Sequence, residues 1–357
     1  MKYLILTTSM GHESIAKAIE QALSKDQNEV MLVKETFSEV TFQYQPIYQF
    51  FPRLNGKYYK IAKNELVIKL MENIYTKKKR AKITKIINDY KPDIVISTYF
   101  LYNFALSDIK NELKFKFINI VANPKTVHPL EFSPEADYNL VYDEETLKQA
   151  EGFEIPKEKL KEIGWFTQRQ FFKIPNPKPS KNDKLTILIS AGSLGTNNIL
   201  KFLPTFFHYQ KDFKYIFVAG KNRVLHNIFK NYKKLCSMTK RDEKDIIIIG
   251  YTEKMSELMR EADIVAGKAG PNLLFEAVAS GKPFLALTYI PGQEDGNLDI
   301  IETKNLGWNA LTPKKAQEIL SKIAKNGELL GAKNESISKE RDFLEKTGER
   351  LIALLEN

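Results

Sequence analysis

Apolar runs of strand length alternate with segments of helical periodicity in the first half of the chain. The run at 2–8 (KYLILTT) is continuous, and Ile15, Ile19 and Leu23 follow it at helical spacing. Further continuous runs predict strands at 93–99, 115–121 and 138–142. Apolar strands without alternation are typical of a parallel sheet buried on both faces. The pattern therefore predicts a doubly wound α/β domain.

A proline-rich segment separates this half from a second one. Residues 173–183 (KIPNPKPSKND) contain three prolines and no apolar periodicity, as linkers do. Beyond it the same alternation resumes, with strands expected at 185–190, 214–219, 245–249, 263–266 and 283–288, helices at 253–261 and 271–280, and a closing amphipathic helix at 334–356. Two Rossmann-like domains that face a cleft are therefore expected.

The expected domain boundaries follow from this pattern. Residues 1–170 form the N-terminal domain, 171–183 the linker, 184–335 the C-terminal domain, and 336–357 a helix that packs back toward the first domain. A chain of 357 residues with 43% hydrophobic content can bury a core in each half.

The remaining composition indicates a cytoplasmic protein. Cys236 is the single cysteine, which excludes an intrachain disulfide and fits a reducing compartment. No run approaches the ~18 to 20 uncharged apolar residues of a spanning helix. The apolar start of the chain is shorter than a signal-peptide core and has no small-residue cleavage site after it.

The positive charge is concentrated in one segment. The formal net charge is +10, and residues 53–91 hold 12 basic and 3 acidic residues, or +9. The aromatic residues in or just before this segment are Phe42, Tyr44, Tyr48, Phe50, Phe51, Tyr58, Tyr59 and Tyr75. Rings beside lysines suit an anionic lipid surface and suit stacked nucleic-acid bases equally well. A solvated basic helix is the plain alternative.

Two glycine-containing turns follow predicted strands. Gly11 and His12 come after the first strand and begin a helix, at the sheet edge where doubly wound folds bind ligands. A histidine there is either an ordinary cap or a general base. Gly192 and Gly195 follow the strand at 185–190 and would let the backbone approach a phosphate. The second turn is not a clean G-x-G-x-x-G motif, and a plain strand-to-helix turn explains it equally well.

The segment 267–297 (GKAGPNLLFEAVASGKPFLALTYIPGQEDGN) is the most informative part of the sequence. Gly270 and Pro271 open a helix whose N–H groups, with Lys268, could hold a diphosphate. Glu276 could accept hydrogen bonds from ribose hydroxyls. On the loop after the next strand, Gln293 and Glu294 could bind sugar hydroxyls.

This segment resembles the donor-binding signature of the monogalactosyldiacylglycerol synthase family and its bacterial diacylglycerol glucosyltransferase relatives. The signature reads T-K-A/P-G-x-x-x-x-x-E, followed by P-G-Q-E-x-G-N, and the shared residues are Lys268, Gly270, Glu276, Pro291, Gly292, Gln293, Glu294, Gly296 and Asn297. Counterparts in the same order lie at 123–132, 143–165, 217–222 and 248–259. The first loop departs from the family's G-G-G-H or G-x-G-H, because Ser9 and Met10 precede Gly11 and His12.

The resemblance implies a GT-B fold and an inverting hexosyltransferase that moves glucose or galactose from a UDP-sugar to diacylglycerol or a glycosyl-diacylglycerol. His12 is the expected base and His128 a second candidate. Uracil is expected near Gly250 and Tyr251. The residues expected to bind the UDP-sugar are Gly192, Asn222, Gly250, Tyr251, Met255, Lys268, Ala269, Gly270, Pro271, Glu276, Gln293, Glu294 and Asn297.

The first domain is expected to receive the lipid at the cytoplasmic face of the cell membrane, as a peripheral protein. The residues expected to contact lipid or acceptor are Gly11, Tyr48, Phe50, Phe51, Tyr58, Tyr59, Lys77, Lys78, Lys79 and Arg80. No D-x-D triplet occurs in the sequence, so neither a metal ion nor another cofactor is expected.

Three alternatives stay open at this point. A UDP-sugar 2-epimerase would use similar diphosphate contacts, and a transferase could act on another lipid such as a polyprenyl-linked sugar. A nucleic-acid-binding protein would use residues 53–91 and show salt-sensitive affinity.

Overall fold

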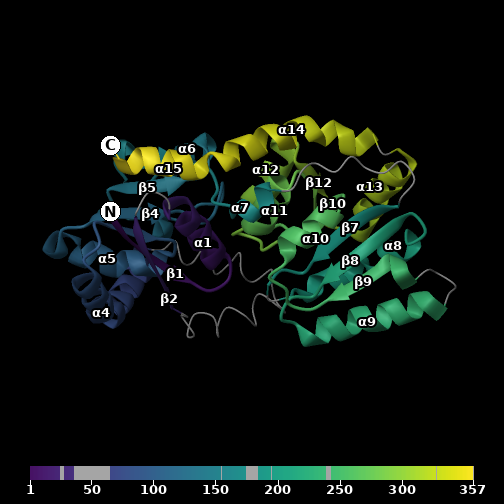
Figure 1. Ribbon diagram of the computed structural model, residues 1–357, viewed down its shortest axis with the longest axis horizontal. Coiled ribbons are helices and arrows are strands. Elements are labelled where there is room, and N and C mark those ends of the chain that lie inside the picture. The colour runs from purple at the N-terminus through teal and green to yellow at the C-terminus, as the bar shows by residue number, and fades with distance from the viewer. Residues whose placement is uncertain are drawn as a thin grey trace.

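The computed structural model describes residues 1–24, 28–35, 65–153, 155–173, 184–193, 195–238, 243–326 and 328–356. Two parallel sheets of six strands organise this part of the chain, each covered by helices (Figure 1). The predicted α/β fold with two doubly wound domains is confirmed. The expected linker at 171–183 lies mostly outside the described residues.

The first sheet has the strand order β2-β1-β3-β4-β5-β6. Its strands are β1 (Lys2–Thr8), β2 (Glu29–Glu35), β3 (Ile94–Ser97), β4 (Lys116–Ile120), β5 (Tyr138–Val141) and β6 (Leu160–Glu162). Its helices are α1 (Gly11–Leu23), α4 (Glu65–Tyr90), α5 (Phe100–Leu113) and α6 (Glu144–Ala150), and the short helix α7 (Arg169–Phe172) follows at the boundary with the second domain. Strand β1 pairs with β2 on one side and β3 on the other, and it is almost wholly buried, as its apolar run predicts.

The second sheet has the strand order β12-β11-β10-β7-β8-β9. Its strands are β7 (Leu185–Ser190), β8 (Phe213–Val218), β9 (Ile246–Ile249), β10 (Ile264–Lys268), β11 (Phe284–Thr288) and β12 (Gly307–Asn309). Its helices are α8 (Leu203–His208), α9 (Arg223–Met238), α10 (Met255–Glu261), α11 (Pro271–Ala279), α12 (Asp295–Thr303) and α13 (Pro313–Lys325). The strand order reverses between β7 and β10, and ligands of doubly wound sheets bind beyond such a point.

Two helices close the chain where the sequence pattern predicts one. Helix α14 (Glu328–Glu345) packs against α11, α13 and α7, and α15 (Thr347–Glu356) packs against α1 of the first domain. Figure 1 shows both helices along the upper edge of the molecule, spanning the second domain and then the first.

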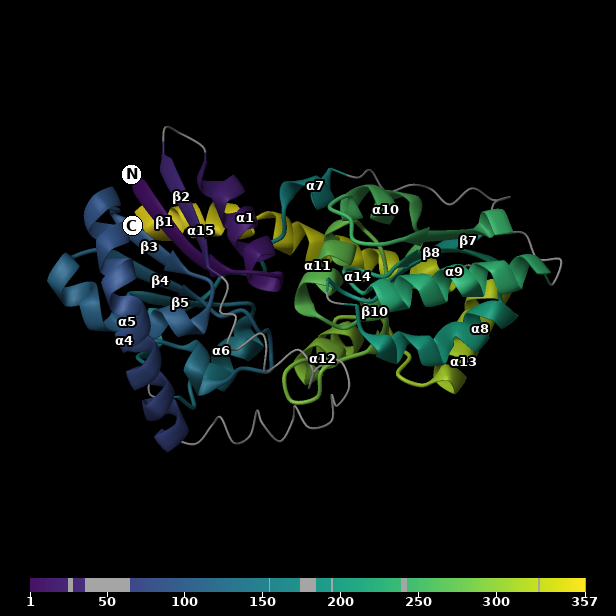
Figure 2. The same cartoon turned by 90° about the horizontal axis from the view of Figure 1, so that it is seen from below.

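The two domains share part of one hydrophobic core. The ring of Phe275, on α11, stacks on Trp165 at 5.3 Å and lies 4.7 Å from Tyr142, and both partners belong to the first domain. In Figure 2, α11 lies where the two domains meet. The helix that follows β10 is therefore held by residues of both domains.

Within the described ranges, each helix falls short of the length or the apolar character that crossing a bilayer requires.

Candidate active site

The carboxyl ends of the two sheets face each other across the domain boundary. Asn272, at the start of α11, donates a hydrogen bond from Nδ2 to the carbonyl oxygen of Gly11 (3.0 Å). The backbone N–H of Gly296 donates to Oγ1 of Thr126 (2.6 Å). These contacts join the turn after β1 and the loop after β4 to the loops after β10 and β11. The predicted cleft residues are thus brought together from segments far apart in sequence.

His12 lies at the start of α1 with a defined orientation. Its Nδ1 is 2.6 Å from the carbonyl oxygen of Thr98, which can only accept, so Nδ1 carries the proton and Nε2 is the basic nitrogen. The ring packs against Tyr99 at 4.7 Å between centroids. Burial lowers the pKa of His12 from 6.5 to about 4, and the Thr98 contact opposes this shift. His12 is therefore neutral at physiological pH and presents Nε2 as a proton acceptor.

The turn before His12 has an unusual backbone. Met10 has φ 68° and ψ −130°, a conformation that glycine adopts far more readily than methionine. A side chain at Gly11 would place its Cβ 2.6 Å from Nδ2 of Asn272. Gly11 therefore allows the two domains to approach closely, and Met10 retains a glycine-like geometry without being glycine.

Lys268 and Glu294 form an ion pair at the N-terminus of α11. A Cβ on Gly270 would lie 2.8 Å from the Lys268 ammonium nitrogen and 3.4 Å from Oε1 of Glu294. The second oxygen of Glu294 accepts a hydrogen bond from the backbone of Ile290 (2.7 Å). Burial raises the pKa of Glu294, and the charge of Lys268 opposes this effect. The ammonium group thus lies where the helix N-terminus also attracts anions.

The P-G-Q-E loop is anchored to the start of the same helix. Asn297 is buried and donates from Nδ2 to the carbonyl oxygen of Ala269 (2.7 Å). The backbone N–H of Ala269 donates to the oxygen of Thr288, at the end of β11 (2.7 Å). Pro271 occupies the first helical position, and Gln293 is half-buried on the loop. These residues therefore form one cluster, in which Glu294 and Asn297 bind protein groups.

Glu276 contacts the first domain. Its Oε1 accepts a hydrogen bond from the hydroxyl of Ser14 on α1 (3.3 Å), and Gln168 donates to that hydroxyl (3.2 Å). Burial raises the pKa of Glu276 from 4.5 to about 7, and the Ser14 contact opposes this shift. The carboxyl group predicted to hold ribose hydroxyls is thus held by a hydroxyl from the opposite domain.

A cavity of about 310 Å³ lies at the start of α9, lined by Gly220, Lys221, Asn222, Arg223, His226, Gly250 and Tyr251. Asn222 donates to the carbonyl oxygen of Gly195 (2.8 Å) and accepts from the backbone of Leu225 (3.0 Å). It therefore caps α9 and holds the glycine turn after β7, which includes Gly192. Met255, at the start of α10, packs against the core and does not line this cavity. Three predicted positions, Asn222, Gly250 and Tyr251, do line it.

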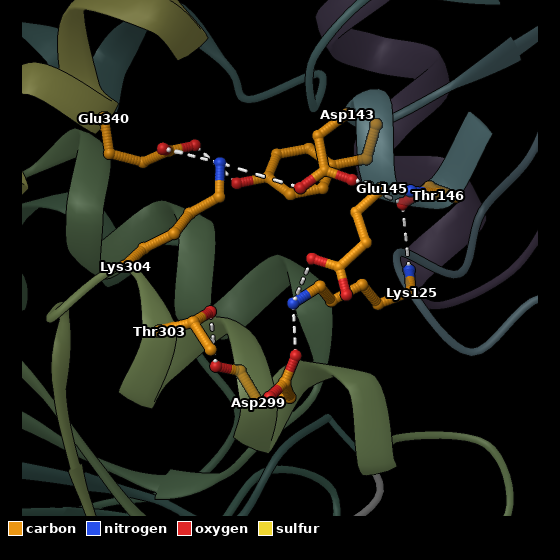
Figure 3. A network of polar contacts seen from close by, with 9 residues as sticks. Lys125, Asp143, Glu145, Thr146, Asp299, Thr303, Lys304 and Glu340 are labelled. Carbon is orange, nitrogen blue, oxygen red and sulfur yellow. Dashed lines mark hydrogen bonds and ion pairs between the residues drawn. The ribbon is translucent and has the colours of Figure 1, made fainter. Parts of the chain in front are cut away.

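Charged residues reinforce the domain boundary away from the helix N-terminus (Figure 3). Lys125, in the loop after β4, pairs with Glu145 of its own domain and with Asp299 of α12. Lys304, at the end of α12, lies 3.0 Å from Glu340 of α14 and 3.7 Å from Asp143 of the first domain. The first domain, the second domain and α14 therefore meet in one network.

His128 has a structural contact. It is buried before a short 3-10 helix (Pro129–Glu131), and its Nδ1 accepts a hydrogen bond from the backbone of Leu130 (3.1 Å). Its own backbone N–H donates to Oε2 of Glu131 (3.3 Å). The side chain therefore caps this turn.

The basic residues predicted to contact lipid lie on α4. Lys79 pairs with Glu35 at 2.6 Å, and Arg80 pairs with Asp108 and Glu112. Lys77 and Lys78 are exposed. Tyr48, Phe50, Phe51, Tyr58 and Tyr59 lie outside the described residues. Half of the basic cluster thus also serves to hold α4 on its own domain.

Sequence reasoning missed three residues that contact predicted site residues. Asn272 and Ser14 make these contacts across the domain boundary, and Thr98 contacts His12 within the first domain. None of the three is a shared residue of the family signature. Within the described ranges no group of three His, Cys, Asp or Glu side chains is arranged to hold a metal ion.

Comparison with known proteins agrees with this architecture. Residues 12–165 match the model of the monogalactosyldiacylglycerol synthase family, and residues 186–347 match the C-terminal domain of glycosyltransferase family 28. The processive diacylglycerol beta-glucosyltransferase of Bacillus cytotoxicus is 27% identical over 322 residues, which cover 85% of this chain and 80% of the relative. The Bacillus cereus (strain B4264) enzyme of the same name is 28% identical over 324 residues, with the same coverage.

Solved structures share the fold at low identity. The UDP-GlcNAc 2-epimerase from Neisseria meningitidis bound to UDP-GlcNAc has a TM-score of 0.63 at 16% identity and covers 100% of both chains. MurG of Acinetobacter baumannii has a TM-score of 0.64 at 14% identity and covers 100% of this chain and 99% of that one. The predicted family resemblance is thus confirmed: the chain is a glycosyltransferase of the GT-B fold, similar in its N-terminal half to the monogalactosyldiacylglycerol synthase family and in its C-terminal half to the C-terminal domain of glycosyltransferase family 28.

Proposed function

We propose that the protein transfers glucose or galactose from a UDP-sugar to diacylglycerol or a glycosyl-diacylglycerol, with inversion at the sugar. The observation that carries this proposal is the hydrogen bond between Asn272 and Gly11, which holds the turn of His12 against the start of α11. A proton acceptor on the first domain thereby lies close to the N-terminus of α11, beside which strand β10 ends at Lys268. The names of the Bacillus relatives supply the acceptor class.

The reaction follows from these groups. The acceptor hydroxyl attacks the anomeric carbon of the sugar, and its proton moves to Nε2 of His12. The bond from that carbon to the diphosphate oxygen breaks, and UDP leaves with the electron pair. Lys268 and the N–H groups at the start of α11 stabilise the developing negative charge. The Thr98 carbonyl keeps the ring oriented and stabilises its protonated form. Because a lysine and a helix N-terminus supply positive charge, we propose that transfer needs no metal ion.

The donor would occupy the second domain. We assign the uracil to the cavity at Asn222, Gly250 and Tyr251, next to the glycine turn after β7. The ribose hydroxyls would replace the hydroxyl of Ser14 as donors to Glu276. The diphosphate would replace Glu294 as the ion-pair partner of Lys268. The carboxylate of Glu294 would then accept hydrogen bonds from the sugar hydroxyls. Donor binding would thus exchange two contacts that exist without it.

The acceptor would come from a membrane surface. Helix α4 carries exposed Lys77 and Lys78 and belongs to the domain that contains His12. Basic residues near an anionic leaflet each contribute ~1 kcal/mol of attraction. We propose that the protein binds peripherally at the cytoplasmic face through this domain.

The test is transfer of radiolabelled sugar from UDP-glucose and from UDP-galactose, assayed separately, to diacylglycerol in anionic vesicles with a chelator present. His12→Ala should lower transfer by ~10² to 10⁴, and Glu294→Ala should also lower it. His208→Ala, at an exposed histidine of α8, is the matched control and should retain activity. Release of free sugar without glycolipid would favour the epimerase alternative, and loss of transfer in chelator would refute the metal-independent step.

A further inference from the structure

Helix α9 of the second domain has an exposed apolar stripe in addition to its buried face. It buries Leu225, Phe229, Tyr232 and Cys236 against its own sheet. Val224 is 66% exposed, Leu235 52% and Met238 74%. Residues 224, 228, 231, 235 and 238 are spaced as one side of a helix, and four of these five positions are apolar. A second apolar surface therefore runs along the helix and faces away from the core.

Basic residues lie beside this stripe. The helix contains Arg223, Lys230, Lys233 and Lys234 and no acidic residue. Helix α13 of the same domain shows the usual pattern of a solvated helix, in which Lys315 lies 3.6 Å from Glu318. An apolar stripe flanked by lysines is typical of a helix that lies in a membrane interface.

The position of α9 matches that of α4. In Figure 1 the two helices lie along the lower edge of the molecule, one in each domain, opposite α14 and α15. Figure 2, the view from below, shows both helices lengthwise. A flat surface beneath the molecule would therefore meet both helices side-on.

We propose that α9 is a membrane-contacting helix, which rests on an anionic lipid surface together with α4. The proposed function places lipid contact on the first domain alone, so this contact adds a second support. Insertion of Val224, Leu235 and Met238 removes apolar surface from water, while Lys230 and Lys234 reach lipid phosphates. A second copy of the chain fits this face less well, because two such helices in contact would bring their lysines together.

The experiment is co-sedimentation of the full chain with vesicles, without any sugar donor. Vesicles of phosphatidylcholine with phosphatidylglycerol are compared with phosphatidylcholine alone. One variant combines Lys230→Glu with Lys234→Glu, and a second combines Leu235→Ser with Met238→Ser. The matched control combines Lys314→Glu with Lys322→Glu on α13, which reverses the same number of exposed lysines.

Both α9 variants should lower the partition coefficient on anionic vesicles about tenfold or more, and the control should change it less than twofold. All substituted side chains are exposed, so melting temperatures should stay near that of the wild type. The proposal is overturned if the wild type does not bind anionic vesicles, if the α9 variants bind like the wild type, or if the control falls equally. It is also overturned if light scattering shows that the serine variant separates a dimer while vesicle binding is unchanged.

These outcomes are independent of catalysis. Vesicle binding through α9 without sugar transfer would contradict only the proposed function. Sugar transfer by a protein whose α9 variants bind vesicles normally would contradict only the contact proposed for α9.

Discussion

Asn272 of the second domain is hydrogen-bonded to the carbonyl oxygen of Gly11 in the first (3.0 Å), directly beside the candidate base His12. The same amide accepts a hydrogen bond from Nε1 of Trp165 (3.1 Å). Because Asn272 lies in the first turn of α11, it fixes the distance between the base and the helix N-terminus proposed to hold the diphosphate. Asn272 is thus a positioning residue for the proposed transfer.

Asn272→Leu should lower kcat about tenfold or more, because small displacements of a catalytic group are costly. It should also lower the free energy of unfolding by ~1 to 2 kcal/mol, since two polar groups lose their partner. Steady-state transfer assays and thermal unfolding measure both effects. Trp165→Phe is the control, since it keeps the ring stacked on Phe275 and the bond to Gly11. Equal loss of kcat in both variants would contradict the positioning role.

Met10→Gly should stabilise the fold. The backbone at Met10 (φ 68°) is strained for a residue with a Cβ, and such strain costs on the order of 1 to 3 kcal/mol. Glycine removes this strain but increases the entropy of the unfolded chain by up to ~1 kcal/mol. Denaturant unfolding should show a net gain, and Met10→Ala, which keeps the Cβ, should show none. A lower stability for the glycine variant would contradict the argument.

UDP affinity should rise with pH through about 7. Burial raises the pKa of Glu276 to about 7, and the ionised carboxylate accepts two hydrogen bonds where the protonated form offers fewer acceptors. Calorimetric titration with UDP at pH values from about 6 to about 8, on both sides of the Glu276 pKa, measures this change in affinity. Glu276→Gln should bind more weakly and lose the pH dependence. An unchanged pH profile in this variant would show that another group titrates.

His12 should make the fold less stable as the pH falls. Its pKa is about 4 in the folded protein and 6.5 ordinarily, so the unfolded chain takes up the proton first. The contribution of His12 to the free energy of unfolding is therefore fully present above about pH 6.5 and is lost as the pH falls toward about 4. Glu276 acts in the opposite direction because its pKa is raised. Its contribution to the free energy of unfolding is present below pH 4.5 and is lost as the pH rises toward about 7. The difference in melting temperature between wild type and His12→Gln should thus shrink as the pH is lowered, and a constant difference would refute this assignment.

Gly296→Ala should separate the two domains at the P-G-Q-E loop. A Cβ there would lie 2.6 Å from both Cβ of Lys125 and Oγ1 of Thr126. We expect a loss of ~1 to 3 kcal/mol in stability, as for other overpacked sites, together with weaker transfer. Gly331→Ala is the matched control, since a Cβ there meets nothing within 4 Å and alanine favours the helix. Similar losses in both variants would argue against a clash at Gly296.

The sequence predicted the central strands well and missed three of the four edge strands of the two sheets. Strands β1 and β7 match their apolar runs residue for residue, because central strands of a parallel sheet are buried on both faces. The strands without a prediction, β2, β6 and β12, all lie at sheet edges. Edge strands need no continuous apolar run, so β2 alternates between exposed and half-buried residues.

The site was predictable where it is local in sequence. The segment 267–297 folds into one cluster, so its sequence motif predicted most of the residues proposed to bind the UDP-sugar. Contacts such as Ser14 to Glu276, which are 262 residues apart, leave no local pattern. The family resemblance located Glu276, but neither Ser14 nor the contact between the two.

The packing of α15 on α1 has a consequence for the order of folding. Leu351 and Leu355 are buried, and Gly348 lies against Ala22, so the final helix completes the packing around a helix near the start of the chain. Domains generally begin to fold during synthesis in the order in which they leave the ribosome. Here the first domain lacks one layer of its packing until helix α15 (Thr347–Glu356) has left the ribosome.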